Sequence, residues 1–185
     1  MPGRDVTILV VCTANQCRSP LTAVSLQQRA ADAALPVRVE SAGIMAQPGF
    51  PATPQTIDAA RKLGFDLSGH TSTPLDVDAI ASADLVIGLE RRHVQEVVLC
   101  APGTFPKVYT LRELARRGAA VGSRSDNQTV ADWLTQVHAG RRPTDLLGMS
   151  ADDDIADPTG SNAVDHRTTA EEIDALTGVV LDLLF

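Results

Sequence analysis

Short apolar runs alternate with helical patterns along the first part of the chain. Residues 6–11 form a continuous, mostly β-branched apolar run, which is typical of a strand buried on both faces of a parallel sheet. Helix-forming residues follow over 20–34, and Pro20 is suited to the first turn of a helix. The pattern therefore predicts that the chain opens as strand, loop and helix.

The same alternation continues for another five elements. The predicted elements are strands at 37–40, 83–88 and 107–109 and helices at 54–63 and 91–100. Strands that alternate with helices indicate an α/β fold with a parallel sheet.

The alternation breaks at residues 118–154, which are rich in Gly, Ser and Asp. A short helix is predicted at 130–137, and it holds the only tryptophan, Trp133. We interpret 118–154 as an inserted, mobile surface segment within a single domain that spans residues 1–185. Apolar residues then recur at helical spacing over 170–185, which predicts a closing helix packed on the sheet.

Composition and charge narrow the classes of function. Hydrophobic residues make up 44% and charged residues 21% of the chain, values typical of a protein that buries a core. A formal net charge of -7 argues against a nucleic-acid partner and against an anionic membrane surface. A phosphate group would therefore have to be bound by local features of the chain.

Cysteine usage indicates a reducing compartment. The three cysteines, Cys12, Cys17 and Cys100, match neither a secreted disulfide framework nor a paired zinc motif. The apolar run near the N-terminus is too short for a signal peptide or a membrane span. We expect a cytoplasmic protein with no membrane partner.

The stretch best suited to chemistry lies between the first predicted strand and helix. Residues 12–20 read CTANQCRSP: a cysteine, five residues, then arginine and serine. Five residues allow a loop to curl round a tetrahedral anion, with backbone N–H groups directed inward and a helix N-terminus adding partial positive charge. Open α/β sheets bind their ligands at this end of a strand, so we predict a phosphate-binding loop.

The same loop suits nucleophilic chemistry. A helix N-terminus and an arginine favour the thiolate, which is the reactive form of Cys12. The planar guanidinium of Arg18 can bind two phosphoryl oxygens together, and Ser19 could donate a hydrogen bond to Cys12. The alternative makes Cys12 a small buried apolar residue and Arg18 a solvated residue at a helix start. The strand before this stretch and the helix after it favour a phosphate-binding loop over this alternative.

The segment ILVVCTANQCRSPLTA resembles the signature of the low-molecular-weight protein tyrosine phosphatases. SAG at 41–43, His70, ADLVIGLE at 83–90 and Asp157-Pro158 follow in the order of that family. The resemblance covers most of the chain apart from about 118–154. It implies a three-layer α/β fold with a central four-stranded parallel sheet flanked by helices, and a reaction that needs no metal or other cofactor.

The resemblance implies chemical roles for three residues. Cys12 would be the nucleophile, Arg18 the phosphate clamp and Asp157 the general acid. A carboxylic acid on a loop stiffened by Pro158 can protonate a leaving group. The alternative is that Asp157, like the acidic residues at 152–154, belongs to a loop that is only solvated, but Asp157 alone precedes a proline as in the family. The expected reaction is a double displacement through a phosphocysteine, catalysed mainly by positioning and charge stabilisation.

Further residues are implied to form and support the loop. The loop residues besides the nucleophile and the clamp are Thr13, Ala14, Asn15, Gln16, Cys17 and Ser19. The resemblance implies a supporting hydrogen-bond network of Asn15, Ser19, Ser41 and His70.

Three positions depart from the family pattern. Ala14 stands where the family usually has glycine, so a positive φ there would cost about 1 kcal/mol. Gln16 replaces the aliphatic residue of the tyrosine phosphatases and the threonine of the related protein-arginine phosphatases. Thr159 stands where tyrosine-specific members carry an aromatic ring. The expected partner is thus a protein carrying phosphotyrosine or phosphoarginine, with inorganic phosphate or a similar oxyanion as a ligand of the loop.

Two other functions stay open. An arsenate reductase on the same fold would need a pair of cysteines late in the chain, whereas only Cys100 follows Cys17, and we expect Cys100 to be a buried apolar residue. A binding module that has lost turnover would agree with Ala14 and with the missing aromatic ring. Cys17 could be inert, or it could trap an oxidised Cys12 as a disulfide.

Overall fold

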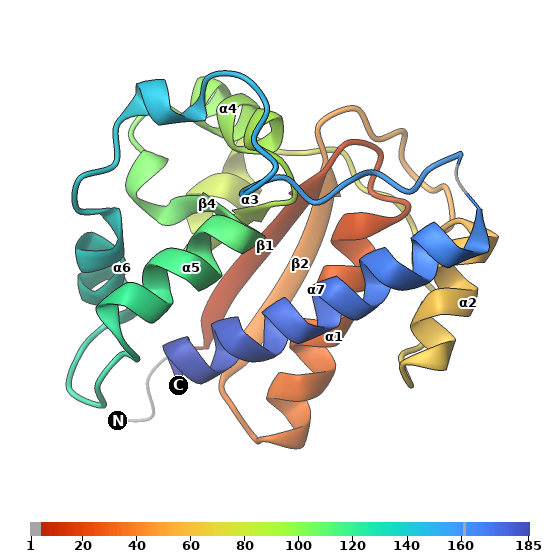
Figure 1. Ribbon diagram of the computed structural model, residues 1–185, viewed down its shortest axis with the longest axis horizontal. Coiled ribbons are helices and arrows are strands. Elements are labelled where there is room, and N and C mark those ends of the chain that lie inside the picture. The colour runs from red at the N-terminus through yellow and green to blue at the C-terminus, as the bar shows by residue number, and fades with distance from the viewer. Residues whose placement is uncertain (1–4, 161) are drawn as a thin grey trace.

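A four-stranded parallel sheet forms the centre of the computed structural model, which describes residues 5–160 and 162–185 (Figure 1). The strands are β1 (Val6–Cys12), β2 (Val37–Gly43), β3 (Leu85–Gly88) and β4 (Val108–Thr110). Their order in the sheet is β2-β1-β3-β4, and every pair is parallel, so the carboxyl ends of all four strands meet at one edge. The predicted α/β fold with this sheet is confirmed.

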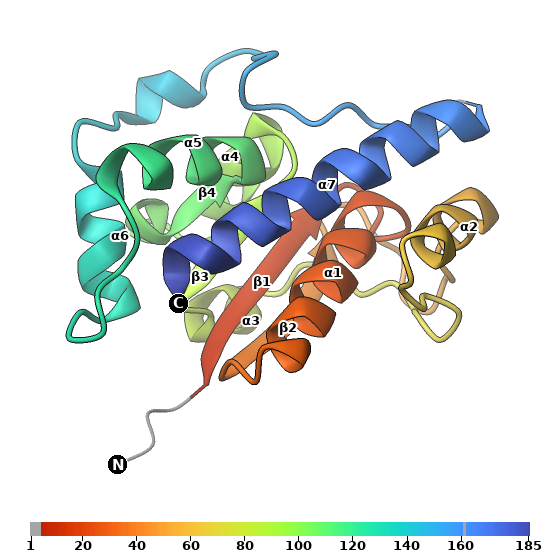
Figure 2. The same ribbon diagram turned by 60° about the horizontal axis from the view of Figure 1, so that its bottom comes forward.

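Helices cover both faces of the sheet (Figures 1 and 2). They are α1 (Arg18–Asp32), α2 (Pro54–Lys62), α3 (Val77–Ser82), α4 (Arg91–Cys100), η1 (Phe105–Lys107), α5 (Leu111–Val121), α6 (Val130–His138), η2 (Pro143–Leu146) and α7 (Ala163–Leu184). The first face packs on α1, α5 and α7, and the second on α3 and α4. Ile8 and Val10 point to the first face and Leu9 and Val11 to the second, as expected of a strand buried on both sides. No helix in the described part of the chain has the length and apolarity to span a bilayer.

The ends of the helices explain the differences from the predicted elements. Helix α7 begins at Ala163, earlier than the predicted residue 170, because the side chain of Asn162 accepts hydrogen bonds from two backbone N–H groups of the first turn. Helix α5 was not predicted. Its N-cap, Thr110, accepts a hydrogen bond from the backbone N–H of Glu113, and its apolar face lies in the core.

The expectation that 118–154 lies on the surface is wrong for its first half. Gly118 belongs to α5, and the predicted short helix is present as α6. The side chain of Trp133 is only 1% exposed, and its Nε1 donates a hydrogen bond of 2.8 Å to the carbonyl of Gly122. The segment therefore contributes a large aromatic side chain to the core.

A buried ion pair ties the same segment to the sheet. Nε of Arg141 lies 2.7 Å from Oε1 of Glu113, and both side chains are almost fully buried. The guanidinium also lies over the rings of Phe105 and Tyr109, at 4.3 and 4.0 Å from their centroids. Helix α6, through Trp133, and the turn after it, through Arg141, are thus both packed against the rest of the chain, which supports a single domain.

Replacing Trp133 with Ala should lower the free energy of unfolding by about 3–5 kcal/mol, because it removes a large core side chain together with its hydrogen bond. Urea unfolding followed by circular dichroism would measure this. Leu147→Ala is the control on the same segment, since Leu147 is 70% exposed and its loss should change stability by less than about 0.5 kcal/mol. Equal effects of the two substitutions would contradict the packed arrangement.

Candidate active site

The predicted phosphate loop connects the carboxyl end of β1 to the N-terminus of α1, where Cys17 is the N-cap residue. The loop turns at Asn15, whose φ is 54° and therefore left-handed. Ala14 does not have a positive φ, so the cost that alanine would carry in that conformation does not arise. Asparagine adopts the left-handed region more readily than most residues do, which makes Asn15 suited to the turn.

The end of β2 presses directly against the loop at Gly43. A Cβ atom at this position would lie 2.6 Å from the carbonyl oxygen of Thr13 and 2.8 Å from the backbone nitrogen of Asn15. The next two residues, Ile44 and Met45, donate backbone hydrogen bonds of 3.0 and 2.9 Å to the carbonyls of Cys12 and Thr13. Only glycine allows this close approach, and it positions the first turn of the loop.

The residues expected to support the loop do lie together. Asn15 is fully buried, and its Nδ2 donates to Oγ of Ser19 at 2.8 Å and to Oγ of Ser41 at 2.9 Å. Its Oδ1 accepts a hydrogen bond of 2.8 Å from the backbone nitrogen of Thr73. Its own carbonyl oxygen lies 2.7 Å from Nε2 of His70. One buried amide side chain thus joins the loop to β2 and to the segment after α2.

Two groups from the loop approach the sulfur of Cys12. Oγ of Ser19 lies 2.9 Å from Sγ, and the backbone N–H of Asn15 donates to Sγ at 3.3 Å. Hydrogen bonds to sulfur stabilise a thiolate more than a thiol. The cysteine is 3% exposed at the bottom of the loop, so the geometry suits a nucleophile reached through the loop opening.

Arg18 is 1% exposed and is held by groups from two distant parts of the chain. Its Nη2 lies 2.6 Å from Oδ2 of Asp157, and its Nη1 donates to the carbonyl of Ile155 at 2.8 Å. Nη1 also forms an ion pair with Glu90. The predicted clamp and the predicted acid are therefore in direct contact, although 139 residues separate them.

The surroundings of Asp157 act on its pKa in opposite directions. Burial raises the pKa, but hydrogen bonds from Thr159 and the positive charges of Arg18 and Arg92 outweigh this effect and lower it overall. A phosphoryl group that takes up the donors of Arg18 would weaken the ion pair with Asp157 and bring its own negative charge. Both changes raise the pKa of Asp157, as a general acid requires.

Three residues of the site were not predicted: Glu90, Arg92 and His93. Glu90 pairs with Arg18 through one carboxylate oxygen and with Arg92 through the other. Nη2 of Arg92 donates to Oγ1 of Thr13 at 2.7 Å, and Nε2 of His93 lies 3.1 Å from the same oxygen. All three follow β3 at the carboxyl edge of the sheet, the signal that could have identified them.

The other two cysteines lie in different surroundings. Burial raises the pKa of Cys17 to about 11, although Oγ1 of Thr56 donates a hydrogen bond of 3.0 Å to its sulfur. A thiol that stays protonated at neutral pH attacks an oxidised cysteine slowly. Cys100 is exposed rather than buried as expected, because it ends α4 on the solvent side. It lies about 15 Å along that helix from Glu90, since each residue adds about 1.5 Å.

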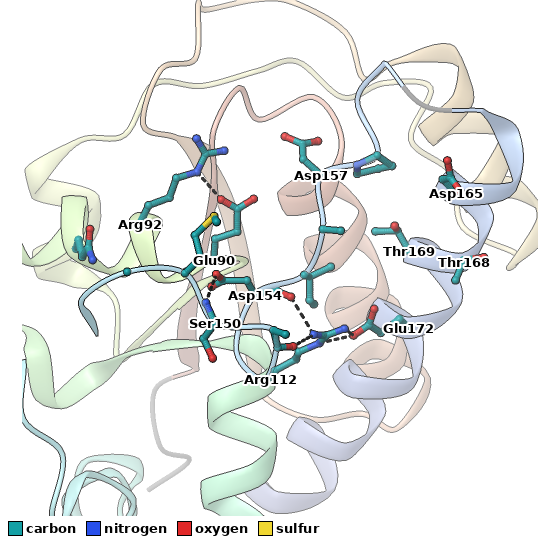
Figure 3. A pocket seen from close by; sticks show the side chains of 17 residues that line it. Glu90, Arg92, Arg112, Ser150, Asp154, Asp157, Asp165, Thr168, Thr169 and Glu172 are labelled. Carbon is teal, nitrogen blue, oxygen red and sulfur yellow. Dashed lines mark hydrogen bonds and ion pairs between the residues drawn. The ribbon is translucent and has the colours of Figure 1, made fainter. Parts of the chain in front are cut away.

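A cavity of about 1030 Å³ adjoins the site (Figure 3). Glu90 and Arg92 line one side, Thr169 and Glu172 of α7 line another, and Asp157 lies between them. The loop of residues 12–18 does not line the cavity, which therefore lies beside the loop on the side of the predicted acid.

Comparison with known proteins connects the chain to one family of enzymes. The family model described as low molecular weight phosphotyrosine protein phosphatase matches residues 7–131. The protein-arginine-phosphatase of Bacillus subtilis is 37% identical over 106 residues, which cover 57% of this chain and 70% of that protein. The probable low molecular weight protein-tyrosine-phosphatase EpsP of Ralstonia nicotianae is 33% identical over 135 residues, which cover 72% of this chain and 90% of that protein.

Solved structures agree with the sequence matches. The low molecular weight protein tyrosine phosphatase from T. tengcongensis superimposes with a TM-score of 0.74 at 25% identity, covering 97% of this chain and all of that one. A mutant of the YwlE arginine phosphatase, solved with a phosphorylated active-site serine, superimposes with a TM-score of 0.71 at 27% identity. It covers 95% of this chain and 93% of that one.

Replacing Gly43 with Ala should weaken the binding of inorganic phosphate at least about tenfold, because the new Cβ would displace the backbone of the loop. Isothermal titration calorimetry would measure the dissociation constant. Gly178→Ala is the matched control, since a Cβ at that helical position would lie 3.7 Å from the nearest side-chain atom. Unchanged phosphate affinity in Gly43→Ala would show that the loop tolerates the displacement.

Proposed function

Because this chain belongs to the family of low molecular weight phosphotyrosine protein phosphatases, we propose that it hydrolyses a phosphorylated side chain of a protein through a cysteine nucleophile. One observation supports the assignment of chemical roles to Cys12, Arg18 and Asp157. The guanidinium of Arg18, on the same loop as Cys12, is also bound to Asp157. A nucleophile, a phosphate clamp and an acid thus surround one small volume.

The first step transfers the phosphoryl group to sulfur. The thiolate of Cys12 attacks phosphorus in line with the leaving group, and the guanidinium of Arg18 and the loop N–H groups bind the phosphoryl oxygens. The bond from phosphorus to the leaving oxygen or nitrogen breaks as Asp157 supplies a proton to that atom. The phosphorylated serine in the YwlE mutant supports a covalent intermediate at this position of the fold.

The second step releases phosphate. A water molecule attacks phosphorus, Asp157 takes its proton, and the bond between phosphorus and sulfur breaks. Ser19 and the backbone N–H of Asn15 stabilise the departing thiolate of Cys12, because both lie within hydrogen-bond reach of its sulfur. The enzyme returns to its starting state, and inorganic phosphate leaves the loop.

The substrate is a protein that carries phosphotyrosine or phosphoarginine. Relatives are named for both activities, and Thr159 supplies no ring to stack on tyrosine. The cavity beside Asp157 lies where the part of the substrate beyond the phosphoryl group would pass. Three free cysteines support a reducing compartment, the cytoplasm, as the place of action.

The two alternative functions, an arsenate reductase and a binding module, differ from a phosphatase in the chemistry they require. An arsenate reductase would pass oxidation from Cys12 to two further thiols, and the distance of Cys100 from the site disfavours that relay. A binding module would hold a phosphorylated peptide without cleaving it, so turnover is the measurement that excludes it.

Wild-type protein should hydrolyse p-nitrophenyl phosphate without added metal, and Cys12→Ser should lower kcat by at least about 10³-fold, because serine is a far weaker nucleophile at neutral pH. The release of nitrophenol measures the rate. Matched peptides carrying phosphotyrosine or phosphoarginine, compared by kcat/KM, would then identify the substrate. A wild type that binds such a peptide and leaves it intact would favour the binding module.

Replacing Asp157 with Asn should lower kcat about 10²- to 10³-fold for phenyl phosphate, whose leaving group needs a proton, and much less for p-nitrophenyl phosphate. Comparison of kcat for the two esters tests the role of the acid. The exposed carboxylate of Asp152 provides the control, since Asp152→Asn should leave both rates unchanged. Equal losses for the two esters in Asp157→Asn would rule out proton donation.

A further inference from the structure

The side-chain oxygen of Thr13, the first residue after the proposed nucleophile, lies within hydrogen-bond distance of two side chains. Nη2 of Arg92 donates to it at 2.7 Å, and Nε2 of His93 lies 3.1 Å away. Arginine can only donate, but a histidine nitrogen can donate or accept. The protonation of His93 therefore decides how the Thr13 hydroxyl is oriented.

The opposite nitrogen of the ring settles the protonation. Nδ1 of His93 accepts hydrogen bonds from the backbone N–H groups of Leu89, at 3.3 Å, and of Glu90, at 3.1 Å. The lone pair of Nδ1 is thus in use, and the ring proton is on Nε2. The ring is fully buried, and burial, together with the charges of Arg18 and Arg92, lowers the pKa of His93 to about 3, so the ring is neutral.

A threonine hydroxyl has one hydrogen and two lone pairs. In Thr13 both lone pairs are occupied, one by Arg92 and one by Nε2–H of His93. The hydroxyl hydrogen has no acceptor among residues 5–160 and 162–185, and the side chain is partly exposed. Its hydrogen is therefore available to an acceptor other than these residues, such as a water molecule or a bound ligand.

We propose that His93 and Arg92 are positioning residues that hold the Thr13 hydroxyl as a hydrogen-bond donor to an oxygen of the bound phosphoryl group. The inference rests on the proposed function and adds to it a donor outside the loop backbone. Such a donor stabilises the negative charge on the phosphoryl oxygens, and fixing its orientation in advance avoids reorganisation during the reaction.

Thr13→Val keeps the shape of the side chain and removes the hydroxyl, so it should raise the inhibition constant of inorganic phosphate and lower kcat/KM, each by about 10-fold or more. Thr13→Ser retains the hydroxyl and should stay within about threefold of the wild type. A Thr13→Val enzyme that keeps the phosphate inhibition constant of the wild type would overturn the proposal.

A double-mutant cycle tests the role of His93. His93→Asn can keep an acceptor near the two backbone N–H groups of α4 while it removes the donor to Thr13. If His93 acts through Thr13, the double variant should bind phosphate no more weakly than Thr13→Val alone. Losses that add would show that His93 has a separate, structural role. Should His93→Asn fail to fold by circular dichroism, the comparison of Thr13→Val with Thr13→Ser still decides the donor role.

The role of Thr13 as a donor can be tested independently of the proposed phosphatase activity. Calorimetry of phosphate binding to the wild type and to Thr13→Val needs no turnover, so the donor can be tested even in a chain that does not catalyse. Loss of turnover in Cys12→Ser with unchanged phosphate affinity in Thr13→Val would support the phosphatase and reject the donor.

Discussion

The site is organised around a permanent positive charge that is withdrawn from water. Arg18 cannot lose its proton in a protein, and only 1% of it is exposed, so other groups must compensate for its lost hydration. Two carboxylates and a carbonyl do so: Glu90 after β3, and Asp157 and Ile155 before α7. The need to satisfy one guanidinium thus brings together segments from three parts of the sequence, and one of its partners is Asp157, the proposed acid.

This arrangement would allow a protein with a net charge of -7 to bind an anion. The attraction comes from short-range donors inside the loop and not from the field of the whole molecule. It would also couple the binding of a phosphoryl group at Arg18 to the pKa of Asp157. In the proposed reaction, a phosphoryl group would compete with Asp157 for the donors of Arg18, and the carboxylate released from that ion pair would carry the proton needed in the first step. The proposed clamp and the proposed acid would thus exchange partners with each other, and the ion pair of Arg18 with Glu90 would help to keep the guanidinium oriented.

Local features of the sequence were sufficient for much of this site. The apolar run of β1, the spacing of Cys12 and Arg18 and the start of α1 are neighbours in the chain, and together they predicted the loop. The supporting residues and Asp157 came from the resemblance, and the structure brings them to the expected places.

Properties that depend on the packing of distant segments were predicted poorly. The burial of Trp133 and the exposure of Cys100 follow from which helix faces meet, and no periodicity over ten residues determines that. The left-handed turn at Asn15 was not predicted, because the family pattern drew attention to the glycine position occupied by Ala14, whereas the loop has its positive φ at the next residue.

Glu90, Arg92 and His93, the residues after β3 that were not predicted, show what knowledge of the strand order would add to a reading of the sequence. Strand β3 pairs directly with β1, with Val11 opposite Gly88, so the residues that follow the two strands must lie side by side. A turn of helix begun there presents its first side chains to the loop, and Glu90, Arg92 and His93 are those side chains. Nothing in the sequence marks these three residues as unusual, and it is the order of the strands that places them beside the loop. In a parallel sheet, then, the chemistry of a loop is shared with whatever follows the adjacent strand. Once β3 is placed next to β1, His93, a buried histidine with both ring nitrogens engaged, becomes a direct neighbour of the predicted phosphate loop.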